Sequence, residues 1–477
     1  MSFADVLEKT GVDASSIRLN ELEVSLRLDA EYYSRKYLET EALLKTKPHE
    51  SLKSLVSQIV SFGAYALTNQ YSYRESGIPF IRCKDIKGVD IDFTDVLYID
   101  EAAHKILWKS DIQPENVLLT MSGSVGNVAI AWDDLEYPIN SNQDVAKITI
   151  NKDKVNPYYI TAFFASRYGQ LTIKRLPVGS VQQHVFIWQL ETLPIPVAGQ
   201  KLQQTCEELL RAYRKKRKES IASYKIAEQK LLAAIGLSYY QANPENVSTR
   251  HLSDAIIANR FDAEYWQPKY DDIENKVKSL SFGTLGSIAQ WKKGIEVGSV
   301  AYETEGIPFI RIGNLSRQEI VDNDQKYISP ELYKSLKDDF SPHKNEILFS
   351  KDGTAGIAHR LTDDVTGIVS GGILRLTVTD PNINPDYLTV CLNSLLVQMQ
   401  VERYCGGSII QHLKTSDFEK IVVPVLDKAK QKEIADTAYQ SRLALEEAKA
   451  LLERAKRAVE VFIEQDEQAA LKAIKDV

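Results

Sequence analysis

Cysteine is scarce in this sequence. The four cysteines, Cys83, Cys206, Cys391 and Cys405, show neither a paired pattern nor the close spacing of a zinc site. We therefore expect reduced thiols and a cytoplasmic protein rather than a disulfide framework. The first residues, Met1–Asp5, lack a basic stretch followed by an apolar core, so no signal peptide is expected. Apolar runs long enough to cross a bilayer are also missing.

Positive charge is not in excess either. The formal net charge is −7 at pH 7, which argues against a protein covered by basic surface and is the main objection to nucleic-acid binding. The charge is unevenly distributed, however. Residues 197–236 contain nine Lys or Arg and four Asp or Glu, and the stretch Arg214–Lys218 is basic throughout. An acidic protein can therefore still carry a basic stripe along one element.

Familiar catalytic motifs are missing as well. The sequence has no Gly-x-x-x-x-Gly-Lys-Ser/Thr loop, no Gly-x-Gly-x-x-Gly that opens a helix after a strand, and no His-Glu-x-x-His. The four residues from Asn156 to Tyr159 faintly resemble the Asn-Pro-Pro-Tyr motif of amino-group methyltransferases. Asparagine followed by proline also suits a helix N-terminus, and we favour that interpretation. We expect no metal, cofactor or catalytic residue in this chain.

What the sequence does contain is a duplication. Five short blocks occur twice in the same order, at offsets between 228 and 233 residues. They are Asp-Ala-Glu-Tyr (29–32 and 262–265), Gly-Ile-Pro-Phe-Ile-Arg (77–82 and 306–311), Gly-x-x-Gly (123–126 and 353–356), Asn-Pro-x-Tyr (156–159 and 384–387) and Gly-Ser-x-x-Gln-His (179–184 and 407–412). A period this long indicates two similar domains, because solenoid repeats have periods of roughly 20–50 residues.

Hydrophobic patterning predicts matching elements in the two repeats. We expect helices at 28–44 and 157–168 in the first repeat, and at 262–277 and 385–401 in the second. The expected strands are 78–82, 117–121 and 145–150, then 307–312, 347–350 and 373–378. The two Gly-x-x-Gly blocks are interpreted as tight turns rather than as phosphate-binding loops. Because strands and helices mix without regular alternation, we predict an α+β fold for each repeat.

Each repeat is predicted to end in a long helix with apolar residues at steps of four and three. This spacing is typical of a coiled coil, and the alternative is an ordinary amphipathic helix on its own domain. The basic stretch interrupts the pattern in the first helix. The predicted seam residues are Leu202, Leu209, Tyr213, Ile221, Tyr224 and Leu231 in the first helix, and Ile434, Leu445, Leu452, Val459 and Phe462 in the second.

These elements define a set of predicted boundaries. They are a first domain at 1–198, a helix at 199–237, a linker at 238–249, a second domain at 250–426, a second helix at 427–466 and a C-terminal tail at 467–477.

Taken together, the blocks resemble the specificity subunits of Type I restriction–modification systems. The resemblance rests on Gly-Ile-Pro-Phe-Ile-Arg, the strand before Gly-x-x-Gly, Gly-Ser-x-x-Gln and the apolar run with proline before each helix. All four occur twice, over nearly the whole chain. Family members often have a Pro-Leu-Pro-rich run ending in Glu-Gln before each helix, which is reduced here to Pro194–Pro196 and Val423–Val425.

The resemblance implies a non-catalytic subunit that recognises DNA for phage defence. Each repeat would be a target-recognition domain for one half of a split, asymmetric DNA target, and the two long helices would pair antiparallel between them. Expected partners are double-stranded DNA, two methyltransferase subunits that use S-adenosylmethionine to methylate adenine, and motor-nuclease subunits. Two alternatives are a scaffold that assembles proteins without reading DNA, and an enzyme with an unrecognised site. Salt-dependent DNA binding would exclude the scaffold.

Candidate DNA contacts are expected in the polar loops between the shared blocks. They are Tyr65, Ser122, Ser124, Lys174 and Arg175 in the first repeat, and Lys292, Lys293, Lys351 and Thr354 in the second. The shared motif adds Gln183, His184, Gln411 and His412, because glutamine can read adenine with two hydrogen bonds. The alternative for this motif is a turn that holds the domain together. Gly-Ile-Pro-Phe-Ile-Arg is expected to be core, with only Arg82 and Arg311 as possible contacts.

Overall fold

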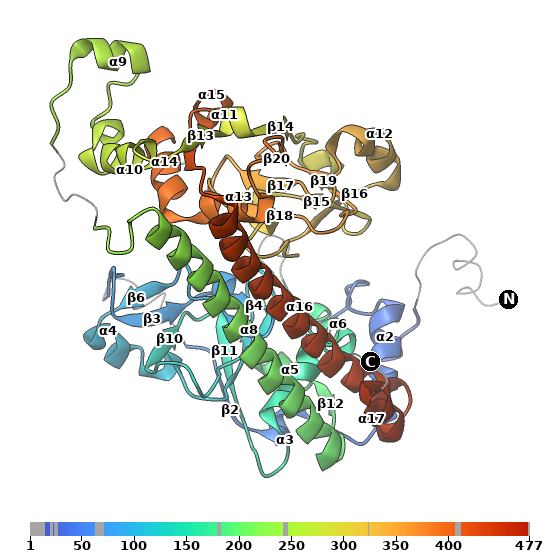
Figure 1. Ribbon diagram of the computed structural model, residues 1–477. Coiled ribbons are helices and arrows are strands. Elements are labelled where there is room, and N and C mark those ends of the chain that lie inside the picture. The colour runs from blue at the N-terminus through green and yellow to red at the C-terminus, as the bar shows by residue number, and fades with distance from the viewer. Residues whose placement is uncertain are drawn as a thin grey trace. The chain divides into compact units, whose positions relative to one another are not determined.

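A computed structural model of the chain describes residues 15–19, 22, 27–62, 71–178, 183–241, 247–322, 324–405 and 412–475. The chain forms two compact units. Unit 1 comprises Met1–Lys215 and Glu447–Val477, and unit 2 comprises Lys216–Glu446. The division falls within two long helices, so each helix contributes one half to each unit. Figure 1 shows the chain with many of its helices and strands labelled.

The elements alternate irregularly along the chain. From the N-terminus to the first long helix they are α2 (Arg35–Lys45), β1 (His49–Ser51), α3 (Leu52–Leu55), β2 (Val56–Val60), β3 (Ile78–Ile81), β4 (Ile86–Lys87), β5 (Asp90–Ile91), β6 (Leu97–Ile99), α4 (Glu101–Ile106), β7 (Asp111–Ile112), β8 (Val117–Thr120), β9 (Val128–Ile130), β10 (Ile139–Ser141), β11 (Val145–Ile150), α5 (Pro157–Ala165), α6 (Arg167–Lys174), α7 (Ile187–Glu191), β12 (Pro194–Pro196) and α8 (Gln200–Ala234).

The second half of the chain follows a similar order. Its elements are α9 (Leu252–Ala258), α10 (Pro268–Lys278), β13 (Phe282–Thr284), α11 (Leu285–Ile288), β14 (Ala289–Lys293), β15 (Ile307–Ile310), β16 (Lys326–Ile328), α12 (Pro330–Phe340), β17 (Ile347–Ser350), β18 (Ala358–Arg360), β19 (Ile368–Val369), β20 (Ile373–Val378), α13 (Pro385–Asn393), α14 (Leu395–Tyr404), α15 (Thr415–Phe418), β21 (Val422–Pro424), α16 (Lys428–Glu464) and α17 (Glu467–Lys475).

The two units repeat one sheet topology. Unit 1 has the strand order β2-β11-β8-β9, and unit 2 has the equivalent order β14-β20-β17-β18. A second sheet contains the Ile-Pro-Phe-Ile strand, which pairs in parallel with a later strand, β3 with β10 and β15 with β19. A two-stranded antiparallel ribbon, β1-β12 or β13-β21, precedes each long helix. The α+β fold predicted for each repeat is therefore confirmed.

Equivalent buried hydrogen bonds join helix and ribbon in the two units. The Tyr159 hydroxyl donates to the Pro196 carbonyl oxygen over 2.8 Å, and Tyr387 donates to Pro424 over 2.9 Å. A buried tyrosine hydroxyl needs such an acceptor, because an unpaired polar group in a core costs free energy. The duplication seen in the sequence thus extends to the polar contacts of the core.

Four predicted helices differ from those observed. The helices expected at 157–168 and 385–401 are each broken in two, at Ser166 and Ser394, whose backbones are extended. The Ser166 hydroxyl accepts a hydrogen bond from Gly169 N over 3.3 Å and so caps a new helix. The helix expected at 28–44 begins later, at Arg35, and the one expected at 262–277 begins at Pro268, which the sequence placed near its start. Apolar spacing alone did not reveal these interruptions.

The asparagines of the Asn-Pro blocks are helix caps, as predicted. The Asn156 side chain accepts a hydrogen bond from Tyr158 N, and the Asn384 side chain accepts from Asp386 N and Tyr387 N. Each following proline occupies the first turn, where its missing N–H is not needed. The faint methyltransferase-like pattern at Asn156 is thereby explained as local helix geometry.

The C-terminal tail predicted at 467–477 is wrong, because Glu467–Lys475 is the helix α17. Ala470 and Ile474, one helical turn apart, are buried in the core of unit 1. The Glu467 carboxylate also accepts a hydrogen bond from Gly199 N over 3.0 Å. This short helix therefore packs beside the start of α8.

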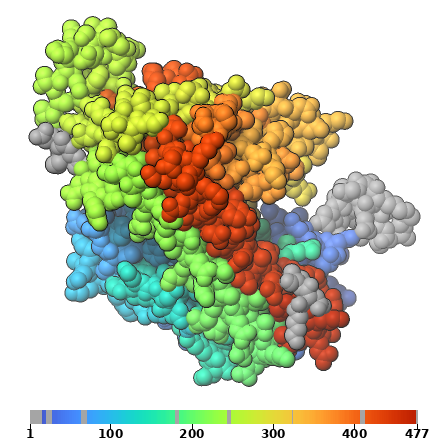
Figure 2. Space-filling model, in the orientation of Figure 1, coloured from blue at the N-terminus to red at the C-terminus, as the bar shows by residue number. Residues whose placement is uncertain are grey.

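The two long helices, α8 and α16, pair within each unit. In unit 2, the Ser220 and Ser441 hydroxyls lie 3.3 Å apart, and Lys230 Nζ lies 2.8 Å from Glu433. As the residue numbers rise along α8, those of the contacting residues in α16 fall, so the two helices are antiparallel. In unit 1, Leu202, Leu209 and Tyr213 of α8 share one core with Val459 and Phe462 of α16. One face of each helix stays at the surface in the space-filling view (Figure 2).

The buried seam of α8 differs from the prediction at one residue. Ile221 is 54% exposed, whereas the preceding Ser220 is fully buried against Ser441. The pattern that resumes after the basic stretch is Ser220, Tyr224 and Leu231, and the Tyr224 hydroxyl accepts a hydrogen bond from Asn393 Nδ2 over 2.8 Å. The apolar pattern favoured Ile221, but the position that faces α16 is the small polar Ser220. Leu231, Ile434 and Leu445 are buried, and Leu452 is half-buried.

Among the described residues, none of the helices contains an apolar stretch of the length that a membrane span needs. The same residues contain no group of three or more His, Cys, Asp or Glu side chains able to hold a metal ion. The four cysteines are free thiols.

A buried lysine in unit 1 and a buried arginine in unit 2 occupy equivalent central strands. Lys147 of β11 donates to the Ser141 hydroxyl over 2.9 Å, whereas Arg375 of β20 donates to the Ser341 carbonyl oxygen and lies 3.7 Å from Glu346. Burial lowers the pKa of the Lys147 ammonium group to about 7.

Replacing Leu445 should test the helix pairing. Leu445 is 2% exposed, so Leu445→Asp would bury an unpaired carboxylate and lower the free energy of unfolding by about 3 kcal/mol. Ala450→Asp places the same charge on the exposed face of α16, and should change stability by less than about 0.5 kcal/mol. Urea unfolding of both variants measures the difference. Equal stability of the two variants would contradict a buried seam at Leu445.

The buried lysine predicts a pH dependence of stability. An unfolded lysine has a pKa of about 10.4, so between pH 7 and that value the unfolded chain binds more protons than the folded chain. Stability should therefore rise with pH over this window. Lys147→Met should raise the free energy of unfolding at pH 7 and flatten the rise of stability with pH. Lys53 is exposed, so Lys53→Met should do neither. Urea unfolding between pH 6 and pH 10 measures both; an unchanged slope in Lys147→Met would contradict the assignment.

Candidate nucleic-acid interface

The Gly-x-x-Gly block of unit 1 forms a tight turn between β8 and β9. Gly123 and Gly126 have φ angles of +67° and +95°, which side chains rarely tolerate. The Thr120 hydroxyl fixes the turn, since it donates to the Ser124 carbonyl oxygen and accepts from Asn127 N over 2.9 Å. Ser124 is held, exposed, at the tip of this turn.

Unit 2 builds the same turn with different residues. Gly353 and Gly356 have φ angles of +60° and +97°. The Ser350 hydroxyl donates to the Thr354 carbonyl oxygen over 2.6 Å and accepts from Ile357 N over 2.9 Å. Thr354 is exposed at the tip, at the position equivalent to Ser124.

Each turn meets the histidine that ends the Gly-Ser-x-x-Gln-His block. In unit 1, Val185 N donates to Met121 O over 2.9 Å, and Ser122 Oγ lies 2.6 Å from His184 Nδ1. In unit 2, Leu413 N donates to Lys351 O over 2.8 Å. We name the two groups cluster 1 (Met121, Ser122, Ser124, Gln183 and His184) and cluster 2 (Lys351, Asp352, Thr354 and His412). Residues predicted separately from the sequence are thus brought together.

The two clusters share a backbone but differ in charge. In cluster 2, Lys351 Nζ lies 2.6 Å from Asp352 Oδ2, and the other carboxylate oxygen of Asp352 faces His412 Nδ1. In cluster 1, the equivalents of the lysine and the aspartate are Met121 and Ser122. Asp352 was not among the predicted contacts, although it directly follows Lys351 in the sequence. Unit 2 therefore presents an ionic group where unit 1 presents a neutral one.

The candidates in and around these clusters differ in accessibility. Lys351 is 4% exposed, so the expectation that it lies in an open polar loop is wrong. Ser122 is also buried, whereas Gln183 is exposed and the His412 side chain is 55% exposed. Tyr65 and Gln411 lie outside the residues that the structure describes.

Candidates away from the clusters have varied environments. Lys174, Lys292 and Lys293 are exposed, the last two on the edge strand β14. Arg175, in contrast, is engaged within unit 1. Its guanidinium binds Glu41 and the Tyr32 carbonyl oxygen, and lies over the Tyr32 ring at 4.1 Å. This placement favours a structural role for Arg175.

The arginines that end the Gly-Ile-Pro-Phe-Ile-Arg blocks bind nearby carboxylates. Arg82 Nε lies 3.0 Å from Asp85, and Arg311 Nη2 lies 3.0 Å from Asp324. Both arginines therefore secure the loop that follows their strand.

Two exposed aromatic residues beside cluster 1 were missed by the sequence reasoning. Phe186 and Trp188 are 44% and 40% exposed, and the Phe186 ring lies 4.9 Å from the His184 ring. The signal was present as two aromatic residues at the second and fourth positions after His184. An apolar run would suggest core residues, but the exposure of both aromatic side chains shows that they do not lie in the core.

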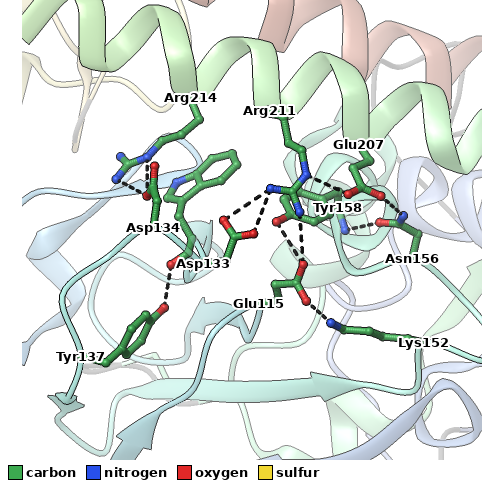
Figure 3. A network of polar contacts seen from close by, with 11 residues as sticks. Glu115, Asp133, Asp134, Tyr137, Lys152, Asn156, Tyr158, Glu207, Arg211 and Arg214 are labelled. Carbon is green, nitrogen blue, oxygen red and sulfur yellow. Dashed lines mark hydrogen bonds and ion pairs between the residues drawn. The ribbon is translucent and has the colours of Figure 1, made fainter.

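Two arginines of α8 point into unit 1: Arg211, one turn before the basic stretch, and Arg214, its first residue (Figure 3). Arg211 lies 2.8 Å from Glu207, 3.1 Å from Asp133 and 3.4 Å from Glu115. Its guanidinium also lies 4.5 Å from the Tyr158 ring centroid. Burial and the Glu115 carboxylate raise the pKa of Tyr158, so this phenol stays neutral. The charge of Arg211 is thus compensated inside the unit.

Arg214 is engaged in a similar way. It lies 3.1 Å from Asp90 and 3.0 Å from Asp134. Asp90 is 7% exposed and also accepts hydrogen bonds from Trp132 Nε1 over 2.5 Å and from Tyr213 over 2.8 Å. The basic stretch is therefore not an open stripe at its first residue, Arg214, whose side chain is 16% exposed. These arginines bind the helix to its own unit.

Comparison with known proteins finds similarity over much of the chain. Residues 278–451 match the family model of the Type I restriction modification DNA specificity domain. Over 390 residues, which cover 78% of this chain and 75% of the relative, the sequence is 23% identical to the Type I restriction enzyme EcoBI specificity subunit of Escherichia coli.

Two solved structures are also similar. The S subunit of a Type-I restriction-modification system from M. genitalium is 14% identical, with a TM-score of 0.36, and the match covers 88% of this chain and 95% of that chain. The HsdS subunit of Thermoanaerobacter tengcongensis is 13% identical, with a TM-score of 0.27, and the match covers 89% and 95% of the two chains.

Asp90 should be far more important for stability than its neighbour Asp134. Asp90→Ala removes the shared acceptor of Trp132, Tyr213 and Arg214, and should cost about 3 kcal/mol because buried donors lose a partner. Asp134→Ala removes a more exposed ion pair with Arg214, and should cost less than about 1 kcal/mol. Urea unfolding of the two variants provides the comparison. Equal losses would show that the buried contacts of Asp90 do not hold α8 to the unit.

Proposed function

Since this chain belongs to the specificity subunits of Type I restriction–modification systems, a family of non-catalytic DNA-recognition subunits, we propose that its two repeats read the two halves of a bipartite, asymmetric DNA target. Each repeat would act as one target-recognition domain. The proposed domains are residues 1–198 and 250–426, with 238–249 as a linker. The two long helices would set the number of base pairs between the half-sites, in the way that dimeric DNA-binding proteins fix half-site spacing.

The observation that carries this proposal is one framework built twice with different chemistry at its surface. The backbone of clusters 1 and 2 is equivalent, yet Met121 and Ser122 are replaced by Lys351 and Asp352. Base contacts specify a sequence and phosphate contacts position the protein. Two equivalent loops with different side chains would therefore read two different half-sites, which gives an asymmetric target.

Roles for the candidate residues follow from their exposure. Lys174, Lys292 and Lys293 are exposed cations suited to phosphate contacts. Ser124, Gln183 and His184 in cluster 1, and Thr354 and His412 in cluster 2, would lie near base edges. Phe186 and Trp188 would add apolar contact beside cluster 1. The buried Lys351 would act through Asp352, whose carboxylate it holds in place.

The methylation chemistry is assigned to partner subunits. We propose that two methyltransferase subunits, which bring S-adenosylmethionine, and motor-nuclease subunits assemble with this chain on DNA. The acidic balance of the chain fits this division, because a complex can draw further positive surface from its partners. This chain would then supply recognition and would neither methylate nor cleave DNA by itself.

Methylation-site mapping tests the division between half-sites. Thr354→Ala with His412→Ala should impair reading of one half-site, and Ser124→Ala with Gln183→Ala should impair the other. A misread base pair typically costs about 1–3 kcal/mol, which is measurable as lost methylation and weaker binding. The experiment compares both double variants with the wild type in cells that carry the partner subunits.

Three outcomes would contradict the proposal. One is a palindromic target, and another is equal damage to both half-sites from either double variant. The third is binding to DNA that does not weaken with salt, since phosphate contacts release counterions. That result would favour a protein scaffold that does not read DNA.

A further inference from the structure

Three aromatic side chains fill one place in the core of unit 1. The Trp132 ring lies 5.9 Å from that of Tyr158 and 6.3 Å from that of Tyr213, and all three residues are buried. The Arg214 guanidinium lies over the Trp132 ring at 5.5 Å. Figure 3 shows Tyr158 and Arg214 in this region. Since the rings come from the end of β9, from α5 and from α8, they fill the space where these elements meet.

Unit 2 has small or charged side chains in the same positions. At offsets of 228 to 230 residues, which also relate the shared blocks, the equivalents of the three aromatic residues are Thr362, Asp386 and Ser441. Two of them, Asp386 and Ser441, line a pocket with about 390 Å³ of free space, counting its open mouth. A polar cavity holds water or a polar ligand, whereas dry cavities are apolar. The place filled by aromatic rings in unit 1 is therefore hollow and polar in unit 2.

Three arginines line this pocket, which we name the arginine pocket. They are Arg317, Arg360 and Arg442. Among the described residues of the lining, Asp386 is the one carboxylate, and it accepts hydrogen bonds from Arg360 Nη1 and, over 3.2 Å, from Arg442 Nη1. With His359 counted as neutral, three guanidinium groups and one carboxylate give the lining a net charge of +2.

These arginines have N–H groups to spare. Arg317 is exposed and forms no hydrogen bond or ion pair with any residue that the structure describes. Arg442, the equivalent of Arg214, donates to Asp386 alone within the described chain. Arg360 Nε is buried and has no partner there either. A guanidinium presents several donors in one planar fork, and a buried donor without an acceptor costs free energy. The pocket thus offers charged donors that an anion can satisfy.

A tyrosine of the lining adds a neutral donor. The Tyr224 hydroxyl accepts a hydrogen bond from Asn393 Nδ2 over 2.8 Å, which leaves its own hydrogen for another acceptor. Burial raises the pKa of the Tyr224 phenol, and the charges of Arg317 and Glu228 shift it in opposite directions. The hydroxyl therefore keeps its hydrogen at neutral pH.

Two carboxylates lie close to the pocket without lining it. Glu319, two residues after Arg317, lies 3.7 Å from Arg217, so its charge is compensated. Glu228, four residues after Tyr224 on α8, is the second. Both are outside the lining, which stays cationic.

The pocket lies where the two long helices meet the sheet of unit 2. Tyr224 belongs to α8, Arg442 to α16 and Arg360 to β18. The loop that carries Arg317 also contacts both helices, because Gln318 Nε2 donates to the Ser220 and Ser441 hydroxyls over 3.1 and 2.7 Å. A ligand held by these side chains would join the helices to the sheet.

We propose that the arginine pocket binds a small phosphate-bearing anion, either free phosphate or a phosphate monoester. Guanidinium forks match phosphate oxygens in geometry and in charge. A phosphate dianion balances the net charge of the lining, whereas a single carboxylate leaves half of it unbalanced. Arg317 and Arg442 hold the anion, and Tyr224 donates a further hydrogen bond. None of the lining residues belongs to clusters 1 or 2, so the inference goes beyond the proposed function and does not rest on it.

Isothermal titration calorimetry of the full chain tests the site with sodium phosphate, at an ionic strength kept constant with sodium chloride. One phosphate should bind per chain. Arg317→Gln should weaken binding about ten- to a hundredfold, because hydrogen bonds from a charged donor are lost. Lys334→Gln removes an exposed positive charge from α12, outside the pocket, and should bind phosphate like the wild type.

Two further measurements sharpen the test. Arg317→Lys keeps the charge but not the fork, so its affinity for phosphate should fall between those of the wild type and Arg317→Gln. Titration with adenosine monophosphate separates the two sources of the phosphate group. Binding as tight as that of phosphate shows that a monoester enters the pocket, and much weaker binding assigns the site to the free ion.

Urea unfolding gives a readout that does not depend on heats of binding. Phosphate should raise the urea midpoint of the wild type more than that of Arg317→Gln, because a ligand stabilises the state that binds it. Phosphate also stabilises proteins in general by exclusion from their surface, and the comparison between the two proteins removes this effect. Since Arg317 is exposed, both proteins should unfold at the same urea concentration without phosphate.

Several results would overturn the inference while leaving the proposed function intact. They are a wild type that binds no phosphate at millimolar concentration, equal phosphate affinity of the wild type and Arg317→Gln, and acetate binding as tight as that of phosphate. Weaker DNA binding by Arg317→Gln, together with a wild type that binds no phosphate, would assign the arginines to the DNA backbone and also overturn it.

Discussion

The hydrogen bond from a buried tyrosine to a proline carbonyl fixes the start of each long helix. Tyr159 binds Pro196 and Tyr387 binds Pro424, so each α-helix that covers the sheet is tied to the ribbon strand that leads into α8 or α16. A glutamine in the first turn of each long helix completes the joint. Gln203 accepts from Asn156 N over 2.8 Å, and Gln431 accepts from Asn384 N over 2.9 Å.

These hydrogen bonds have the same effect in both units. Because the buried donors and acceptors are satisfied only in one arrangement, the helix cannot leave its sheet without exposing unpaired polar groups. The surface loops are free of this constraint. Clusters 1 and 2 can therefore differ in charge while their backbones stay equivalent, and this combination is what a protein that reads two different half-sites requires.

Some of the cations of α8 also hold the fold together. Arg211 and Arg214 of α8 are paired inside unit 1, with the carboxylates of Glu115, Asp90, Asp133 and Asp134. Lys174 and Lys293, in contrast, are exposed. The cations of the chain are thus divided between those that hold the fold together and those that stay at the surface.

The sequence by itself determined the duplication, the α+β class, the strands at 145–150, 347–350 and 373–378, and the two long helices. All of these depend on local patterning or on comparison of the chain with itself. Only the tertiary structure decided that Ser220 rather than Ile221 faces α16, that Lys351 is buried beside Asp352, and that Arg211 points inward. Each of these depends on a partner far away in the sequence, and side-chain periodicity carries no information about the polarity of that partner. The same reason explains α17, whose two buried residues become core only where α8 begins.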